Sequence, residues 1–533
     1  MNVYLLYRDR EWVNTRRYYD IDSIIKDLGV DVLVDSANKG DTLVCQTMKR
    51  VMMVPIDNEA DLKYRHDILY DLLLHEGFTK DVYMMTAKVL KEWEKLGKNK
   101  NEVVVTESKA SLISDINILR VLVMGMTELK KIFAANADVM TSEGLKQLNE
   151  RVQTEFSDDL ETVMYKIIDD LAFYSNPTKV DSLEDTYRTN MPVVTVDCGI
   201  AEGLKLCDVK LENLESELKT VKRPNSLKMK ISGFFKVFDS KNIPLYGETA
   251  MQEDAAVLTY RAVSYVMACC SDTYHSIGRF FENLNMQMAF YYGAVNIKHL
   301  MQKYRIEYCI PEFVGQNCLE YENLKEVVMK IKQSGEVIGN SGELNNKSLV
   351  IITGANQGGK STFLRSLGIA QIMMQAGLFV PAKKYRSGLY PNFFTHFTRR
   401  EDSAMNSGRL DEEMRRMDGI VNHLGENSLI LLNESFASTT ELEGSNIAYD
   451  IIKALNEQNI KIISVTHLLS FAKRVYNEAR DTGRADIAFL SAERLEDGTR
   501  TFKMIAHEPE LTSFGLELYD QIIGNKDSEK QNQ

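Results

Sequence analysis

The sequence predicts an α/β protein in which a mostly α-helical domain precedes a domain with a parallel-rich sheet. Three observations support this fold class. Only nine prolines and 30 glycines occur among 533 residues, which favours long helices over many turns. After residue 305, short apolar runs bounded by glycine alternate with amphipathic stretches, as in parallel α/β sheets. One of these runs leads into a glycine-rich turn that ends in Lys-Ser-Thr.

The helical region extends from about residue 60 to 300, where apolar residues recur at intervals of three and four. Within it, residues 252–303 contain no proline and only two glycines, Gly278 and Gly293. If most of this stretch is one helix of about 45 residues, that helix would be on the order of 70 Å long.

Four apolar runs are expected to be strands that the sheet buries on both faces. They are SLVIITG (348–354), SLILLNE (428–434), IKIISVTH (460–467) and ADIAFLSAE (485–493). An apolar fraction of 44% and a charged fraction of 26% are typical of soluble globular proteins. No apolar run reaches the roughly 18 residues that cross a bilayer, and the N-terminus does not read as a signal peptide. We therefore expect a cytoplasmic protein without membrane contact.

Residues 354–361 match the phosphate-binding pattern G-x-x-x-x-G-K-[ST] position by position. A predicted strand precedes this turn and a predicted helix follows it, so backbone N–H groups and the positive end of a helix would face a phosphate. Lys360 would reach the β- and γ-phosphates, and the hydroxyl of Ser361 would bind Mg²⁺. The expected ATP-binding residues are Gly354, Ala355, Asn356, Gln357, Gly358, Gly359, Lys360, Ser361 and Thr362.

Two other predicted strands end in polar residues at the same edge of the sheet, where ligands bind in open α/β folds. Asn433 and Glu434 end one of them, and Glu434 can polarise a water for attack on the γ-phosphate. His467 ends the other, where its imidazole could contact the γ-phosphate; the alternative is a packed core histidine. The predicted catalytic residues are Lys360, Glu434 and His467.

These motifs together resemble the ATPase domain of the DNA mismatch repair MutS family. The resemblance rests on TGANQGGKSTFLRSLG (353–368), FVPA (379–382), NFFTHF (392–397), EEMRRM (412–417), SLILLNE and SVTH, in this order and spacing. Weaker cues upstream, LKYRHDILYDLL and AFYYGAVNIKHL, are similar to the core and lever domains of that family. The resemblance implies an N-terminal core segment (1–60), a helical core and lever domain (61–304) and an α/β P-loop ATPase domain of the ABC type (305–525). The tail (526–533) has no apolar side chains to bury and is expected to be disordered.

The resemblance also implies a homodimer in which the partner completes each nucleotide site, with Ser407 or Gly408 as the contributing residue. The chain departs from the family there, where Ser-Thr-Phe is usual. Asn433 replaces the family's aspartate, so Mg²⁺ binding would be weaker or turnover slower. Phe436 and Ser438 replace family glycines, which would alter communication across the dimer. No N-terminal mismatch-reading domain is expected, because only some 60 residues precede the first core-like helices.

A basic segment at residues 219–241 contains seven lysine and arginine residues with few acids between them. It is either a solvated loop or helix face, or a surface that contacts the phosphate backbone of DNA. The candidate DNA contacts are Lys222, Arg223, Lys228 and Lys230.

The leading hypothesis is a homodimeric clamp that uses ATP and Mg²⁺ to bind duplex or branched DNA by structure rather than by sequence, with downstream repair proteins as further partners. A net charge of −12 keeps open a second hypothesis, a nucleotide-gated protein scaffold with weak ATPase activity and no DNA binding. The soluble motor of a transporter is a third interpretation, which the roughly 300 residues of helical arms before the phosphate turn disfavour.

Overall fold

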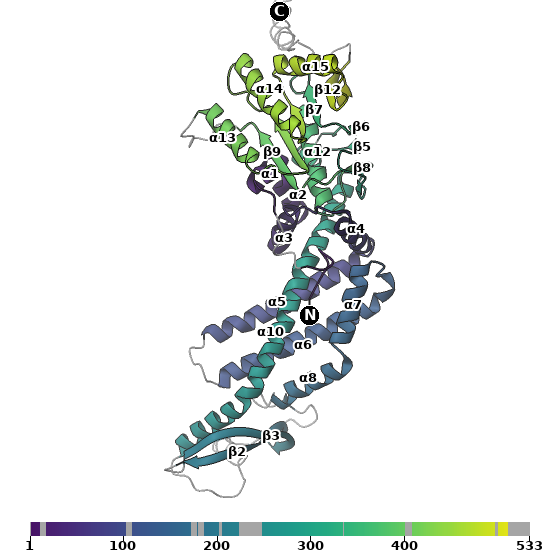
Figure 1. Cartoon of the computed structure of the whole chain (residues 1–533). Coiled ribbons are helices and arrows are strands. Elements are labelled where there is room, and N and C mark those ends of the chain that lie inside the picture. The colour runs from purple at the N-terminus through teal and green to yellow at the C-terminus, as the bar shows by residue number, and fades with distance from the viewer. Residues whose placement is uncertain are drawn as a thin grey trace, which may run out of the picture. The chain divides into compact units, whose positions relative to one another are not determined.

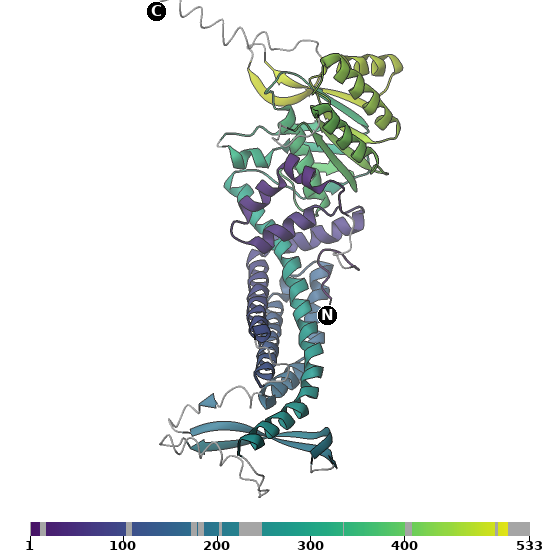
Figure 2. The ribbon, with the colours of Figure 1, turned by 90° about the vertical axis from the view of Figure 1, so that its left-hand side faces the viewer.

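The computed structural model describes residues 2–10, 17–102, 109–171, 178–179, 186–201, 205–222, 248–333, 335–399, 408–495 and 499–509. Contacts divide the chain into two compact units, whose elements are drawn in Figures 1 and 2. The first, called the helical unit here, consists of Met1–Val3, Gly77–Met140 and Leu145–Met288. The second, called the sheet unit, consists of Tyr4–Glu76, Thr141–Gly144 and Ala289–Gln533.

Long helices build most of the helical unit, as the spacing of apolar residues predicts. They are α5 (Glu76–Glu102), α6 (Lys109–Ala135), the short 3₁₀ helix η2 (Ala137–Val139), α7 (Glu143–Glu155), α8 (Asp158–Leu171) and part of α10 (Glu248–Lys303). Because α10 is continuous over 56 residues, the prediction of one long helix over 252–303 is confirmed. Between α5 and α6, the rings of Phe78 and Phe133 meet edge to face with centroids 5.4 Å apart.

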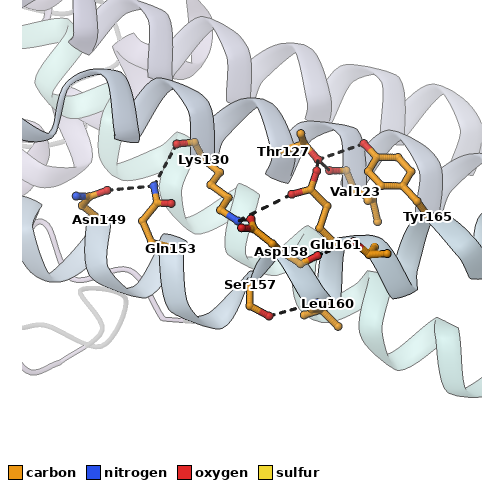
Figure 3. Close-up of polar contacts among 11 residues, drawn as sticks. Val123, Thr127, Lys130, Asn149, Gln153, Ser157, Asp158, Leu160, Glu161 and Tyr165 are labelled. Carbon is orange, nitrogen blue, oxygen red and sulfur yellow. Dashed lines mark hydrogen bonds and ion pairs between the residues drawn. The ribbon is translucent and has the colours of Figure 1, made fainter.

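Polar side chains connect α6 to α7 and α8 (Figure 3). The ammonium of Lys130 contacts the carboxylate of Asp158 and lies 4.0 Å from that of Glu161. The Thr127 hydroxyl donates a 2.8 Å hydrogen bond to Glu161 and lies 3.1 Å from the hydroxyl of Tyr165. Because the Asp158 side chain is 92% exposed, its ion pair with Lys130 adds little stability.

A three-stranded antiparallel sheet interrupts the helices of this unit. Its strands are β1 (Thr178–Lys179), β2 (Thr186–Ala201) and β3 (Lys205–Lys222), in the order β1-β2-β3. The prediction of helix throughout 60–300 is wrong for this stretch. The run Val193–Val196 is β-branched at every position, and this favours a strand that pairs with β3 over a helix.

A six-stranded sheet with the order β13-β12-β7-β11-β10-β9 forms the centre of the sheet unit. Its strands are β7 (Leu349–Thr353), β9 (Asn392–Phe397), β10 (Ser428–Asn433), β11 (Lys461–Val465), β12 (Ile487–Arg494) and β13 (Arg500–Ala506). All neighbours pair in parallel except β12 and β13, which are antiparallel. The four strands expected from apolar runs are confirmed as β7, β10, β11 and β12.

Helices cover both faces of this sheet, which explains why its central strands are apolar at nearly every position. Ile430 and Leu432 of β10 belong to a core with residues of α13 (Arg409–Val421), α14 (Glu441–Glu457) and α15 (Leu469–Thr482). Successive strand residues point to opposite faces, so Leu429 and Leu431 face the other side, where α12 (Lys360–Gln375) packs against β10 and β11. Figure 1 shows α13 beside β9, and α14 contacts β11.

The remaining elements of the sheet unit are four N-terminal helices, a short helix and a small sheet of order β4-β8-β5-β6. They are α1 (Ile21–Leu28), α2 (Val30–Ala37), α3 (Thr42–Met52), α4 (Glu59–Leu74), α11 (Val327–Lys332), β4 (Glu312–Phe313), β5 (Leu319–Leu324), β6 (Asn340–Glu343) and β8 (Lys384–Ser387). α1 contacts both β9 and α12. The N-terminal residues are thus grouped with the large sheet, whereas the predicted domain boundaries at 60 and 304 join them to the core region.

Arg65 of α4 is fully buried in the sheet unit. Its guanidinium donates two hydrogen bonds to the carbonyl of Leu6, at 2.6 and 3.0 Å, and one of 3.0 Å to the carbonyl of Ala376. The guanidinium carbon also lies 4.8 Å from the ring centroid of Tyr7 and 5.9 Å from that of Phe290. Since Ala376 caps the C-terminus of α12, the cation meets the negative end of that helix.

Lys461, the first residue of β11, is a second buried cation and is only 3% exposed. Its Nζ has no hydrogen-bond partner among the described residues, and it lies 5.8 Å from the ring centroid of Tyr390. Burial lowers the pKa of Lys461 to about 8. An uncompensated buried ammonium destabilises the folded state, because the unfolded chain hydrates it.

Replacing Lys461 with methionine should therefore stabilise the sheet unit at neutral pH. The folded state binds the proton of the Lys461 side chain less tightly than the unfolded state, in which the pKa of a lysine is about 10.4. Stability in the natural chain should rise as the pH increases from about 8 to about 10, by on the order of 3 kcal/mol. Urea unfolding of Lys461→Met between pH 7 and 10 should lose this rise, whereas Lys383→Met, at an exposed lysine, should keep it. A methionine variant with the natural pH dependence would contradict the assignment.

Candidate nucleotide site

The glycine-rich turn lies between the end of β7 at Thr353 and the start of α12 at Lys360. Its backbone adopts left-handed angles at Gly354 (φ 111°) and Gly359 (φ 90°), which glycine tolerates best. A Cβ atom on Gly354 would also lie 2.9 Å from the amide nitrogen of Ala492. Both glycines are therefore required by the path of the chain, and the turn closes through a 3.2 Å hydrogen bond from the Gly358 N–H to the Ala355 carbonyl.

Lys360 lies within this turn and is only 5% exposed. Its Nζ donates hydrogen bonds to the carbonyls of Gly354, at 2.8 Å, and Ala355, at 3.0 Å. Burial lowers the pKa of Lys360, and the nearby carboxylate of Glu434 acts in the opposite direction. The structure thus brings two predicted catalytic residues, Lys360 and Glu434, close enough to interact electrostatically.

Glu434 follows the last residue of β10 and has a left-handed backbone, with φ 54°. Its N–H donates a 2.8 Å hydrogen bond to the carbonyl of Val465 at the end of β11. Its carbonyl accepts a 2.7 Å hydrogen bond from the hydroxyl of Thr398, which follows β9. These two neighbours hold a strained conformation that costs on the order of 1–3 kcal/mol, and such strain is concentrated at functional sites.

Asn433 precedes Glu434 and pairs with Val465 and Phe397 in the sheet. Its side-chain oxygen is buried and has no donor among the described residues. An unsatisfied carbonyl-type oxygen at this edge is suited to accept a hydrogen bond from a metal-bound water. In the described ranges, no group of three or more His, Cys, Asp or Glu side chains could hold a metal ion.

His467 follows β11 at the same edge of the sheet, but its side chain is exposed. Burial raises the pKa of Glu441. Hydrogen bonds from Ser470 and Ser445 and the charge of His467 lower it by more, so the pKa is below its usual value. His467 therefore lies near the start of α14. Across the described chain, no hydrogen bond joins it to Lys360 or Glu434.

The segment that follows Glu434 is held by Glu413 of α13, an interaction that the sequence did not reveal. The Glu413 carboxylate accepts hydrogen bonds from the Phe436 N–H, at 2.8 Å, and from the Ser438 hydroxyl. His396 lies 2.7 Å from the Ser435 hydroxyl, and burial lowers its pKa to about 4, so it is neutral. Phe436 and Ser438, where the resemblance implies glycines, thus connect the end of β10 to α13.

Residues of β12 and β13 also border the turn, and sequence reasoning missed them. A Cβ on Gly358 would lie 2.8 Å from the Cβ of Ala492, so β12 forms a wall of the turn. Arg500 of β13 donates a 3.1 Å hydrogen bond to the Gln357 side chain. The only available signal was the apolar run 485–493, which predicts a strand without indicating its neighbours.

For the other predicted site residues, the structure gives burial or position in the chain but no hydrogen bond to the side chain of Lys360 or Glu434 among the described residues. Ser361 and Thr362 are half-buried in the first turn of α12, and Asn356 and Gln357 are exposed. Gly408 is the exposed residue before α13, whereas Ser407 lies outside the described residues. Among the candidate DNA contacts, Lys222 ends β3, and Arg223, Lys228 and Lys230 lie outside the described residues.

Comparison with protein families identifies two matching regions. Residues 350–524 match the family model described as MutS domain V, and residues 57–193 match the MutS2 N-terminal domain. The chain belongs to the MutS family. The domain V match covers the phosphate turn and the strands that carry Asn433, Glu434 and His467.

Curated relatives of this MutS-family chain carry the name DNA mismatch repair protein MutS. A relative from Synechococcus sp. (strain JA-2-3B'a(2-13)) is 35% identical over 150 residues, which is 27% of this chain and 17% of the relative. A relative from Petrotoga mobilis is 30% identical over 183 residues, 33% of this chain and 22% of the relative. One from Trichormus variabilis is 33% identical over 169 residues, 30% of this chain and 20% of the relative. The similarity thus spans about a fifth of the length of these proteins.

None of the helices in the described ranges has the length and apolar character needed to cross a membrane.

Proposed function

We propose that this chain is a P-loop ATPase of the ABC type that uses ATP to control its binding to DNA. The observation that carries the proposal is the position of Lys360, whose ammonium lies inside the glycine turn near Glu434. Membership of the MutS family and the mismatch repair names of its relatives support the link to DNA.

In the proposed reaction, backbone N–H groups of the turn and the Lys360 ammonium bind the β- and γ-phosphates. The Glu434 carboxylate accepts a proton from a water that attacks the γ-phosphorus, while the bond to the ADP oxygen breaks. The products are ADP and phosphate. His467, exposed at the same edge, would contact the γ-phosphate by rotation of its side chain.

Mg²⁺ is expected to enter with the nucleotide, because the phosphates of a nucleotide usually supply ligands to this ion. Ser361 would bind the ion directly, and the buried Asn433 oxygen would accept a hydrogen bond from one of its waters. When bound, Mg²⁺ would neutralise negative charge on the phosphates. Asn433 supplies an acceptor but no charge, so we propose weak Mg²⁺ binding or slow turnover.

The Asn433→Asp variant should reach half-maximal ATP hydrolysis at a lower Mg²⁺ concentration. A charged acceptor adds about 1–2 kcal/mol over a neutral one, so the shift should be on the order of tenfold. Steady-state hydrolysis measured across a Mg²⁺ titration checks this, with Asn422→Asp at an exposed position as the control. Identical titrations for the natural chain and Asn433→Asp would exclude a role for position 433 in metal binding.

We propose that the β2–β3 hairpin takes part in DNA binding. Lys222 pairs with Thr186 at its end, and Lys219 and Arg188 occupy the neighbouring pairs Thr189↔Lys219 and Arg188↔Thr220. Three cationic residues thus occupy one end of the two strands, next to the basic segment that continues beyond residue 222. Contacts of this kind bind the phosphate backbone, so recognition would depend on DNA structure rather than base sequence.

The proposal is tested by measuring ATP hydrolysis of the full chain with and without duplex DNA. We expect stimulation by DNA, and gel-shift affinity that falls with salt with a log–log slope near 0.9 per phosphate contacted. The Glu434→Gln variant, which should hold ATP, allows matched, mismatched and branched duplexes to be compared at one salt concentration. Absence of DNA binding at low salt with ATP present would overturn the DNA assignment.

A nucleotide-gated scaffold without DNA binding is the second candidate, favoured by the net charge of −12 and by Asn433. In both proposed functions, ATP would join two copies of the chain. The segment around Gly408 of one copy would complete the nucleotide site of the other. Hydrolysis that DNA does not stimulate, together with ATP-dependent dimerisation in sedimentation, would favour the scaffold.

A further inference from the structure

Two residues just after β10 have backbone conformations that residues with a side chain seldom adopt. Glu434 has φ 54° and Phe436 has φ 65°, both in the left-handed region. A bulky residue avoids this region because its Cβ crowds the backbone, so it stays there only where the surrounding structure holds it. Residues 434–438, called the Glu434 turn here, must therefore be held by their neighbours.

Packing holds the middle of the Glu434 turn. The Phe436 side chain is fully buried in the core that β10 shares with α13, α14 and α15. Its ring also stacks on the imidazole of His396, with centroids 5.7 Å apart and an interplanar angle of 25°. A Cβ on Gly444 would lie 2.4 Å from the Phe436 carbonyl oxygen, so α14 approaches the turn more closely than any side chain would allow.

The carboxylate of Glu413 supplies polar contacts to the same turn. Glu413 is only 5% exposed, and its two oxygens accept from different residues. Oε2 accepts from the Phe436 N–H, at 2.8 Å, and Oε1 accepts from the Ser438 hydroxyl. A buried carboxylate is costly unless donors surround it, and hydrogen bonds to a charged acceptor are stronger than those between neutral groups. One side chain of α13 thus sets the positions of Phe436 and Ser438.

The backbone of Glu413 extends this contact to Ser435, the residue next to Glu434. The Glu413 carbonyl lies 3.1 Å from Nε2 of His396, and a carbonyl can only accept, so Nε2 carries the proton. Nδ1 of His396, at 2.7 Å, and the His396 carbonyl, at 2.9 Å, are then the acceptors for the Ser435 hydroxyl. Because burial lowers the pKa of His396 to about 4, the ring keeps this neutral form at neutral pH.

We propose that Glu413 is a positioning residue that holds the Glu434 turn so that the Glu434 carboxylate faces the water that attacks the γ-phosphate. The inference rests on the proposed nucleotide function and adds a residue that acts through the turn. The bonds of Glu434 to Val465 and Thr398 hold its backbone on the sheet, and Glu413 holds the chain that leaves it. Rotation of the backbone in 434–436 would displace the carboxylate, and a displacement of about 1 Å can lower a rate on the order of a hundredfold. The alternative is that Glu413 only stabilises the fold.

Single-turnover hydrolysis and ATP binding by the full chain separate positioning from stability. Glu413→Ala should lower the hydrolysis rate on the order of 10- to 100-fold and change the Kd for ATP by less than about twofold, because the turn around Lys360 stays intact. Glu413→Gln should keep most of the rate, since its amide oxygen can still accept from the Phe436 N–H. Ser438→Ala removes one of the two hydrogen bonds, so its rate should lie between those of the natural chain and Glu413→Ala.

A double variant shows whether Glu413 acts through Glu434. The general base is already absent in Glu434→Gln, so adding Glu413→Ala should lower the remaining rate by less than about twofold. Independent effects would multiply instead, and a double variant that loses the full factor of each substitution would overturn the positioning role.

Glu326 provides a matched control for the loss of a buried carboxylate. It is 3% exposed in the same sheet unit and accepts from the Met329 N–H at the start of α11. Glu326→Ala should lower the melting temperature and leave the hydrolysis rate unchanged. Equal losses of rate in Glu326→Ala and Glu413→Ala would overturn the inference.

Ser438→Ala decides the outcome if Glu413→Ala does not fold. A folded Ser438→Ala chain with the natural rate would then overturn the inference, whereas a slower rate at unchanged ATP affinity would support it. A natural chain that neither binds nor hydrolyses ATP would overturn the proposed function, which separates that failure from the failure of this inference.

Discussion

Replacing Lys360 with alanine is expected to weaken ATP binding by about 10- to 150-fold. The ammonium is positioned inside the turn by two backbone carbonyls, and a phosphate that replaced them would gain a charge-assisted hydrogen bond. Hydrogen bonds to charged groups contribute about 1.5–3 kcal/mol, which corresponds to that range of affinity. Titration of the purified chain with ATP measures the loss.

Two comparisons make this result specific. Lys330 also donates to a backbone carbonyl, that of Gly335, but lies on the surface, so Lys330→Ala should bind ATP normally. Glu434→Gln should bind ATP and hydrolyse it on the order of 10²- to 10⁴-fold more slowly, as expected for the loss of a general base. If Lys360→Ala bound ATP as tightly as the natural chain, the turn would not be the nucleotide site.

Replacing Arg65 with methionine is expected to lower the free energy of unfolding of the sheet unit by about 3–4 kcal/mol. Three buried hydrogen bonds would be lost, at about 1 kcal/mol each, together with contacts to two aromatic rings worth roughly 1 kcal/mol. Methionine keeps much of the side-chain volume, so the measurement reports on polar contacts rather than on a cavity. Urea unfolding followed by circular dichroism provides the value.

Arg10 supplies a matched control for this substitution. Its guanidinium carbon lies 4.6 Å from the ring centroid of Tyr7, the same ring that Arg65 contacts, but its side chain is 49% exposed. Arg10→Met should therefore change stability much less. Arg65→Lys should be intermediate, because an ammonium cannot donate in the fork geometry that reaches Leu6 and Ala376 together. A methionine variant as stable as the natural chain would show that burying the charge costs as much as its hydrogen bonds contribute.

The sequence was informative where a pattern is local. The strands β7, β10, β11 and β12 are buried on both faces, so each appears as a short apolar run that needs no knowledge of its neighbours. The turn at 354–361 and the polar residues that follow the strands are also local features, because each is recognised from its spacing along the chain. The β2–β3 hairpin was missed because apolar residues at intervals of three and four were counted without weighing β-branched side chains.

Contacts between distant segments could not be predicted in this way. A Cβ on Gly368 would lie 2.5 Å from a side-chain carbon of Leu28, and the Ile56 N–H donates to the Gln375 carbonyl, yet the sequence contains no sign that the N-terminal helices pack beside α12. The bond from Ser438 to Glu413 likewise depends on residues far apart in the chain. The catalytic and binding roles of the predicted site residues stay predictions.

The backbone crosses from one compact unit to the other five times, after Val3, Glu76, Met140, Gly144 and Met288. Neither unit can therefore be expressed as a single uninterrupted fragment, and the last crossing falls inside α10 rather than in a loop. A truncation there would expose helical amides and carbonyls that now bond each other. Limited proteolysis aimed at releasing the sheet unit should accordingly yield few stable products, and point substitution is the better way to test the contribution of each unit.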